Sequence, residues 1–69
     1  MKLSARNVLK GTVVELKKGA TTANVRIAIA GGAVITSSVT NEAVEDLRLA
    51  TGDEVYAVIK ASNVIVARD

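Results

Sequence analysis

The feature that most constrains the fold is a period-two alternation between Thr22 and Ala30. Apolar side chains occupy every second position, which predicts a β-strand with one face in a core. Alanine is frequent on the other face, which indicates that another surface approaches it closely. The core-facing positions are Ala23, Val25, Ile27 and Ile29, and the opposite face carries Asn24, Arg26, Ala28 and Ala30. Gly31-Gly32 follows and predicts a hairpin with a two-residue turn, because two glycines can adopt the backbone angles that match strand twist.

Four further strands are predicted around this hairpin. They cover residues 8–18, 33–39, 55–60 and 64–67. The first of them carries apolar residues on both faces. A bend or bulge at Gly11 explains this pattern, since a small closed barrel needs such a change of face.

A short helix is predicted after the strand at 33–39. Thr40 and Asn41 are both suitable N-caps, and the acidic residues that follow favour the positive end of a helix. Val44 and Leu47 lie three positions apart and can share a buried side.

These elements predict an all-β protein with one short helix. Five strands with a helix between the third and the fourth are the element order of a five-stranded OB-like Greek-key barrel. A split hairpin sheet and an SH3-like barrel are the competing architectures. No linker or low-complexity segment divides the chain, so residues 1–69 are expected to form a single domain.

A domain of 69 residues has little interior with which to stabilise itself. The chain has no Cys and no His, which excludes disulfides and thiolate or imidazole metal sites. Its carboxylates show no calcium-loop spacing. Because 49% of the residues are hydrophobic and Tyr56 is the only aromatic, we expect aliphatic surfaces that are buried against copies of the same chain.

The charge pattern disfavours several classes of partner. The net charge is +2, and the nine cations are dispersed rather than gathered into the basic stripe of a nucleic-acid surface. A single-strand binder would also carry several stacking aromatics. No apolar stretch approaches the length of a membrane span, and no signal-peptide core follows Met1, so we expect no membrane partner and a cytoplasmic location.

Catalysis is not expected from this composition. The chain lacks His and Cys, which are the usual partners in activating a nucleophile. A dyad of Ser4 and Lys60 is the remaining arrangement, but a domain of this size offers little room for a substrate cleft or an orienting third group.

Two segments near the ends of the chain carry the residue types of an anion site. Ser4-Ala5-Arg6 precedes the first strand, and Lys60-Ala61-Ser62 lies at the end of the strand that follows the helix. Together they supply two cations, hydroxyl donors, and small residues whose backbone N–H groups a ligand can approach. The alternative is that Arg6 and Lys60 are ordinary surface charges and the serines are ordinary polar residues at strand ends.

Several short motifs, taken in order, resemble the molbindin (Mop) family over essentially the entire chain. The motifs are Ser4-Ala5-Arg6-Asn7, Leu9-Lys10-Gly11, Leu16-Lys17-Lys18-Gly19, Ile29-Ala30-Gly31-Gly32, Ile35-Thr36-Ser37 and Val58-Ile59-Lys60. Similar domains occur in molybdate-responsive transcription regulators and in the ATP-binding subunits of molybdate transporters. The chain has no DNA-binding or ATPase segment, so it is similar to the free-standing form.

The resemblance implies an OB-like barrel that assembles into a homo-hexamer, a trimer of dimers. Molybdate or tungstate would bind between the subunits as a ligand, with no catalytic cofactor, for intracellular storage and homeostasis. Ser4, Arg6 and Lys60 match the oxyanion-binding positions of the family. The backbone N–H groups of Ala5 and Ala61 are the implied further donors.

The resemblance also assigns a residue from a neighbouring subunit. Thr40 matches a position that contributes a hydroxyl across the interface, which would leave Asn41 as the helix N-cap. Ala61 stands where the family frequently has serine, and Ser62 is the substitute hydroxyl donor. Asn7 lies on the opposite side of an extended strand from Arg6 and is expected to hold the backbone or an interface.

The ligand chemistry agrees with these donors. Molybdate is a fully deprotonated dianion at neutral pH, so a pocket made of donors suits it. Hydrogen phosphate carries a proton that needs an acceptor, which disfavours it by about 1–3 kcal/mol. Sulfate has no such proton, so its exclusion depends on size. Two other hypotheses stay open, namely an OB-fold nucleic-acid-binding module and a purely structural oligomerisation module.

Overall fold

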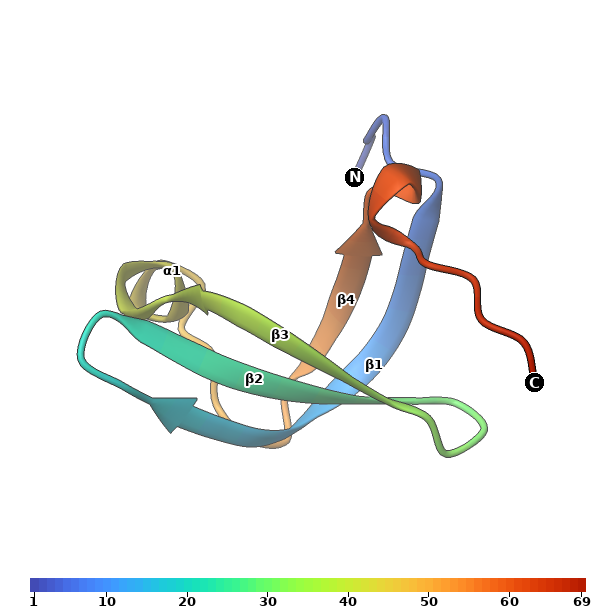
Figure 1. Cartoon of the computed structure of the whole chain (residues 1–69). Helices are drawn as coiled ribbons and strands as arrows, with labels where there is room; N and C mark the ends of the chain where they lie inside the picture. Colours follow the sequence, from blue (N-terminus) through green and yellow to red (C-terminus); the bar gives the residue numbers. More distant parts are fainter.

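The computed structural model describes residues 1–69 and contains four strands, one α-helix and one 3-10 turn. The elements in order are β1 (Asn7–Lys18), β2 (Thr22–Ile29), β3 (Val34–Thr40), α1 (Asn41–Asp46), β4 (Glu54–Ile59) and η1 (Ala61–Asn63). The strands form one antiparallel sheet in the order β3-β2-β1-β4. The sheet curls into an OB-like half-barrel, with α1 beside the end of β3 (Figure 1).

The expected hairpin is confirmed, but its loop is longer than the expected two residues and covers residues 30–33. β2 and β3 pair from Thr22↔Thr40 to Ala28↔Val34, and both Gly31 and Gly32 take a φ of +94° in the loop between them. The alternation along β2 also holds, because Ala23, Val25 and Ile27 are buried while the residues between them are exposed. With Val13, Val44 and Ala57 they form the core.

β1 is the strand on which the other elements are assembled. It pairs with β4 over Asn7–Thr12 and with β2 over Gly11–Lys18, so it is bonded on both edges at Gly11 and Thr12. A Cβ on Gly11 would lie 2.6 Å from the Ala28 carbonyl oxygen and 2.6 Å from the Ile27 side chain. Glycine is therefore required at this position because the neighbouring strand approaches too closely for a side chain.

The bulge in β1 is not at Gly11, where it was expected. The register shifts between Val13 and Glu15, which leaves Val14 as the extra residue. At this point the Val13 N–H donates to the Asp53 carbonyl oxygen (2.9 Å), and the Gly52 N–H donates to the Val13 carbonyl oxygen (2.7 Å). The turn before β4 thus bonds to β1 beside the bulge, a long-range contact that the local sequence does not reveal.

Two expectations about the helix are wrong. Thr40 is the N-cap, since its hydroxyl accepts from the Ala43 N–H at 3.0 Å, whereas Asn41 is the first helical residue and its Nδ2 donates to the Gly19 carbonyl oxygen at 2.9 Å. Leu47 does not share a buried side with Val44 and is 69% exposed. The helix ends at Asp46 with Leu47 as its C-cap, and the chain then turns so that Leu49 packs on the core instead.

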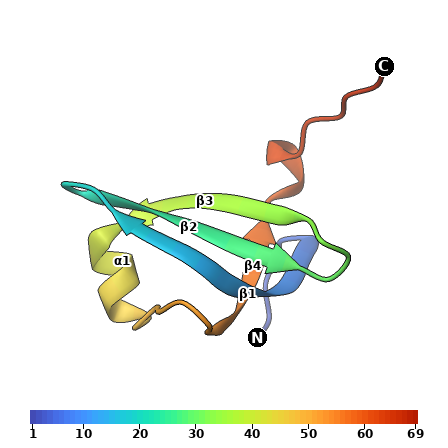
Figure 2. The same cartoon turned by 90° about the horizontal axis from the view of Figure 1, so that it is seen from below.

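The fifth strand expected over residues 64–67 is absent, and the barrel is open rather than closed. η1 turns the chain away from the sheet, and the segment after it extends without a partner (Figure 2). Ile65 is 91% exposed and Val66 89%. A strand needs a neighbour for its backbone hydrogen bonds, and within one chain this segment has none.

The helix ends in a Schellman motif with an unusual residue at its key position. The Leu49 N–H donates to the Val44 carbonyl oxygen at 3.0 Å, and the Arg48 N–H donates to the Glu45 carbonyl oxygen at 3.1 Å. Arg48 has a φ of +51°, in the left-handed region where glycine is preferred.

We therefore expect Arg48→Gly to stabilise the protein by about 1 kcal/mol, because glycine avoids the contact between Cβ and the backbone that left-handed angles impose. Urea unfolding at fixed protein concentration measures the change. Arg48→Ala is the matched control, since it removes the charge and keeps the Cβ. Equal stability of the two variants would show that φ at this position carries no strain.

Candidate functional site

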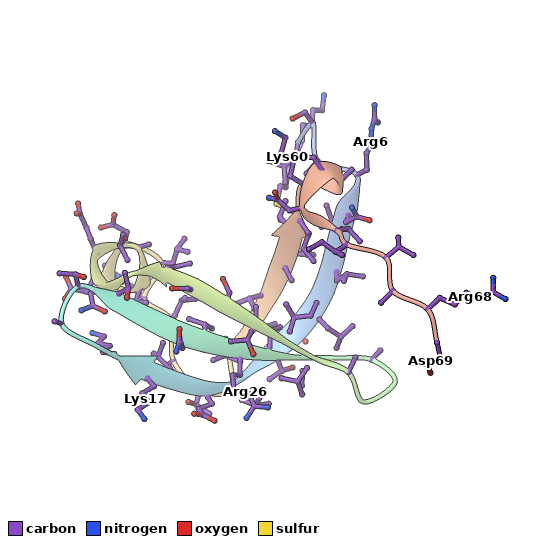
Figure 3. The ribbon with its side chains drawn as sticks, viewed as in Figure 1. Arg6, Lys17, Arg26, Lys60, Arg68 and Asp69 are labelled. Carbon is purple, nitrogen blue, oxygen red and sulfur yellow. The ribbon has the colours of Figure 1, made fainter.

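The two segments expected to bind an anion lie side by side. β1 and β4 are antiparallel, and Asn7↔Ile59 is the last pair of their ladder. Ser4-Ala5-Arg6 therefore arrives at the same end of the sheet from which Lys60-Ala61-Ser62 departs, and Figure 3 shows Arg6 and Lys60 together at this end. An open hollow of about 630 Å³ lies between the segments. Its lining is Ser4, Ala5, Arg6, Val58, Lys60, Ala61, Ser62 and Asn63.

The hollow carries positive charge that nothing in the chain neutralises. The two ion pairs of the structure lie elsewhere, between Lys10 and Glu54 (3.5 Å) and between Arg26 and Glu15 (3.3 Å). Neither Arg6 nor Lys60 contacts a carboxylate, and no Asp or Glu lines the hollow. A small anion can therefore approach both cations without meeting a like charge.

Neutral donors surround the two cations. The hydroxyls of Ser4 and Ser62 are exposed and make no hydrogen bond within the chain. η1 begins directly after Lys60, and the first N–H groups of a helical turn, here those of Ala61 and Ser62, have no partner inside it. The Asn63 N–H donates to the Lys60 carbonyl oxygen at 2.9 Å, which holds the turn in place.

Asn7 holds the backbone at the edge of the hollow, as expected. Its Nδ2 donates to the Ile59 carbonyl oxygen at 3.2 Å, and its side chain does not line the hollow.

One expected site residue lies apart from the others. Thr40 ends β3, and its hydroxyl caps α1, at the far end of the half-barrel from Arg6 and Lys60 (Figures 1 and 3). A single chain therefore brings together the six other expected residues and leaves out Thr40. Val58 and Asn63 line the hollow without having been expected there. The sequence signal that could have identified Asn63 as a lining residue is its position directly after Ser62.

The hollow has no catalytic arrangement. Ser4 and Lys60 share it but are not joined by a hydrogen bond, and no third group orients either side chain. No group of three or more His, Cys, Asp or Glu side chains lies together in the structure. What the residues can do is bind a small anion through charge and donated hydrogen bonds.

Comparison with known proteins shows the class to which this fold and site belong. The family model of the TOBE domain matches residues 3–66. A "Probable molybdenum-pterin-binding protein" of Haemophilus influenzae is 52% identical over 66 residues, which are 96% of each chain. The "Molybdenum-pterin-binding protein 3" of Clostridium pasteurianum is 48% identical over 96% of this chain and 97% of its own.

Solved structures give the same result. MopII of Clostridium pasteurianum, in an apo form, superposes with a TM-score of 0.92 at 48% identity, over 97% of this chain and all of MopII. A molybdate-binding protein of Sporomusa ovata superposes with a TM-score of 0.92 at 37% identity, over 99% of this chain and all of its own. The cytoplasmic molybdate-binding protein ModG, with molybdate bound, gives 0.91 at 55% identity, and this chain spans 46% of its length.

The chain belongs to the TOBE-domain family, and within it to the Mop proteins, or molbindins. The expected family is thereby confirmed. The expectation that the chain is not an enzyme is confirmed as well, because the proteins of this family are binding proteins.

Proposed function

We propose that this protein binds molybdate or tungstate at the hollow between Ser4-Ala5-Arg6 and Lys60-Ala61-Ser62. The observation that carries the proposal is the convergence of two unpaired cations, free hydroxyls and small residues at one open hollow without a carboxylate. The described ligands of ModG and of the Sporomusa protein, both molybdate, support it.

The donor set favours a fully deprotonated tetrahedral anion. Molybdate and tungstate only accept hydrogen bonds at neutral pH, so each donor of the hollow finds a partner. Hydrogen phosphate carries a proton that needs an acceptor, and the hollow offers it no carboxylate, only the weaker acceptors of Ser4, Ser62 and Asn63. If that proton is left unmatched, the cost is about 1–3 kcal/mol.

The names of the relatives include a pterin, and the hollow is compatible with an oxyanion that is free or attached to one. The hollow is open, so part of a larger ligand can extend into solvent while the oxo groups contact the donors. We propose the free oxyanion as the principal ligand because every donor described above suits oxo groups.

We further propose that the protein works as a homo-hexamer, a trimer of dimers, with the site completed at subunit interfaces. The hollow is open to solvent, and Thr40 would join it from a neighbouring chain, as the resemblance implies. α1 begins next to Thr40, so the positive end of the helix would come close to the anion.

The exposed apolar tail of the chain, residues 64–67, supports association. Both edge strands of the half-barrel are unpaired on one side, and a second hollow lies between them, lined by residues 35–37 of β3 and 56–59 of β4. We propose that residues 64–67 of another copy pair there as the fifth strand and close the barrel. This arrangement would bury Ile65 or Val66 and satisfy the strand edges, which otherwise invite uncontrolled pairing.

We propose storage and homeostasis of the oxyanion in the cytoplasm as the biological role. Binding of the oxyanion without catalysis is compatible with this role. The description of ModG as cytoplasmic supports the location. The structure contains no helix with the length and apolar character needed to span a membrane.

The two other hypotheses find less support in the structure. A nucleic-acid surface would need clustered cations and stacking aromatics, but Tyr56 is the sole aromatic and Arg26 is paired with Glu15. A labelled oligonucleotide that bound at physiological salt, whether or not molybdate was present, would favour that hypothesis. A structural module would show no heat of binding in calorimetry with molybdate or tungstate at millimolar concentration.

Native mass spectrometry of the protein with molybdate, and separately with excess sulfate, tests the proposal directly. We expect a hexamer that retains oxyanions after exchange into volatile buffer, and that retains molybdate in preference to sulfate. A monomer without bound oxyanion would contradict both the ligand and the assembly. A hexamer without oxyanion would support the structural module.

Arg6→Ala and Lys60→Ala are each expected to weaken molybdate binding by about 1.5–3 kcal/mol, because each removes a charge-assisted donor. This loss is about 10- to 150-fold in affinity by calorimetry. Lys17→Ala and Arg26→Ala are the matched controls, since they remove cations distant from the hollow. If either test variant bound molybdate with the affinity of the parent protein, the substituted residue would be shown to be an ordinary surface charge.

Deletion of residues 64–69 is expected to dissociate the assembly, because it removes the proposed fifth strand. Deletion of Arg68 and Asp69 alone is the control and should leave the hexamer intact. Light scattering and native mass spectrometry report the mass of each variant. A hexamer that persists without residues 64–69 would exclude strand pairing by the tail.

A further inference from the structure

Asn7 joins the two halves of the hollow. It forms the last pair of the β1–β4 ladder with Ile59, and its Nδ2 donates to the Ile59 carbonyl oxygen at 3.2 Å. Arg6 directly precedes Asn7, and Lys60 directly follows Ile59. Each cation is therefore the immediate chain neighbour of one of the two residues that this bond connects. The other side-chain link between β1 and β4 is the exposed ion pair of Lys10 with Glu54, which lies at the other end of β4 from Ile59.

The end of this ladder needs such a bond. β4 is an edge strand that pairs with β1 alone, and the ends of strands open more readily than their centres. Arg6 and Lys60 are both exposed, so water screens their mutual repulsion, and it is the opening of the strand ends that would move them apart. The Asn7 bond opposes this separation without adding a negative charge to the hollow.

We propose that Asn7 is a positioning residue of the oxyanion site. It does not line the hollow, and it acts by fixing where Lys60 and the following turn lie relative to Arg6. This inference rests on the proposed function, since it assumes that the hollow binds an oxyanion. A site that is held in its binding geometry before the ligand arrives avoids the cost of ordering it on binding.

Removal of the bond is expected to lower affinity while the assembly stays folded. Asn7→Ala should bind molybdate about three- to tenfold more weakly by calorimetry on the assembled protein, the range that corresponds to one hydrogen bond. Asn7→Gln keeps a donor amide and should recover part of the loss. Asn7→Leu keeps the volume, lacks the donor, and replaces Asn7→Ala if the latter does not assemble.

Asp53→Ala is the matched control. Asp53 also makes a hydrogen bond between side chain and backbone, in which its carboxylate accepts from the Ala50 N–H at 2.9 Å, and it lies just before the start of β4, far along the strand from Ile59. Its loss should lower the stability of the protein and leave molybdate affinity unchanged. An equal loss of affinity in Asp53→Ala would show that general destabilisation explains the effect.

A double-mutant cycle separates positioning from a general structural role. If Asn7 acts by placing Lys60 and the turn that follows it, then Asn7→Ala should cause a smaller fold-loss of affinity in a Lys60→Ala background than in the parent, because one of the groups that it positions is already gone. A structural role would give the same fold-loss in both backgrounds. Equal losses, or parental affinity of Asn7→Ala, would overturn this inference, whereas an unaltered protein that bound no molybdate would overturn the proposed function instead.

Discussion

The structure depends on β1 being paired on both of its edges at Gly11 and Thr12. This double pairing is possible because glycine lets the Ala28 backbone and the Ile27 side chain approach within 2.6 Å of where a Cβ would lie. The second half of β1 then contributes Val13 to the core, and the first half carries β4. One strand thus connects the packed end of the half-barrel to the end where the hollow lies.

The hollow and the open side of the barrel both present groups that have no partner within the chain, namely cations in the first case and strand edges in the second. Two cations without a carboxylate partner cost little in isolation because water screens exposed charges. Because neither cation is paired with a carboxylate, both are free to bind an anion. The exposed apolar tail and the unpaired strand edges are likewise tolerable for a short segment, and their burial against another copy would supply stability that so small a core does not.

Features that depend on neighbouring residues were predictable from sequence. β2 follows from its alternation, the hairpin from Gly31-Gly32, and the two donor-rich segments that line the hollow from residue types that sit at strand ends. Features that depend on distant contacts were not. The bulge lies at Val14 because the turn before β4 bonds to Val13, and Leu47 is exposed because the helix ends with Arg48 in a left-handed conformation.

By itself, the sequence determined the number and kind of the first four strands, the helix, and the two donor-rich segments, because periodicity, glycine pairs and residue chemistry are local. Tertiary structure decided which of those segments meet. Antiparallel pairing of β1 with β4 placed Arg6 beside Lys60. The pairing of Thr40 with Thr22, which lies next to the opposite end of β1, left Thr40 away from them. Tertiary structure also decided that residues 64–67 are not a strand within one chain. A strand needs a neighbouring strand for its backbone hydrogen bonds, and η1 directs this segment away from the sheet.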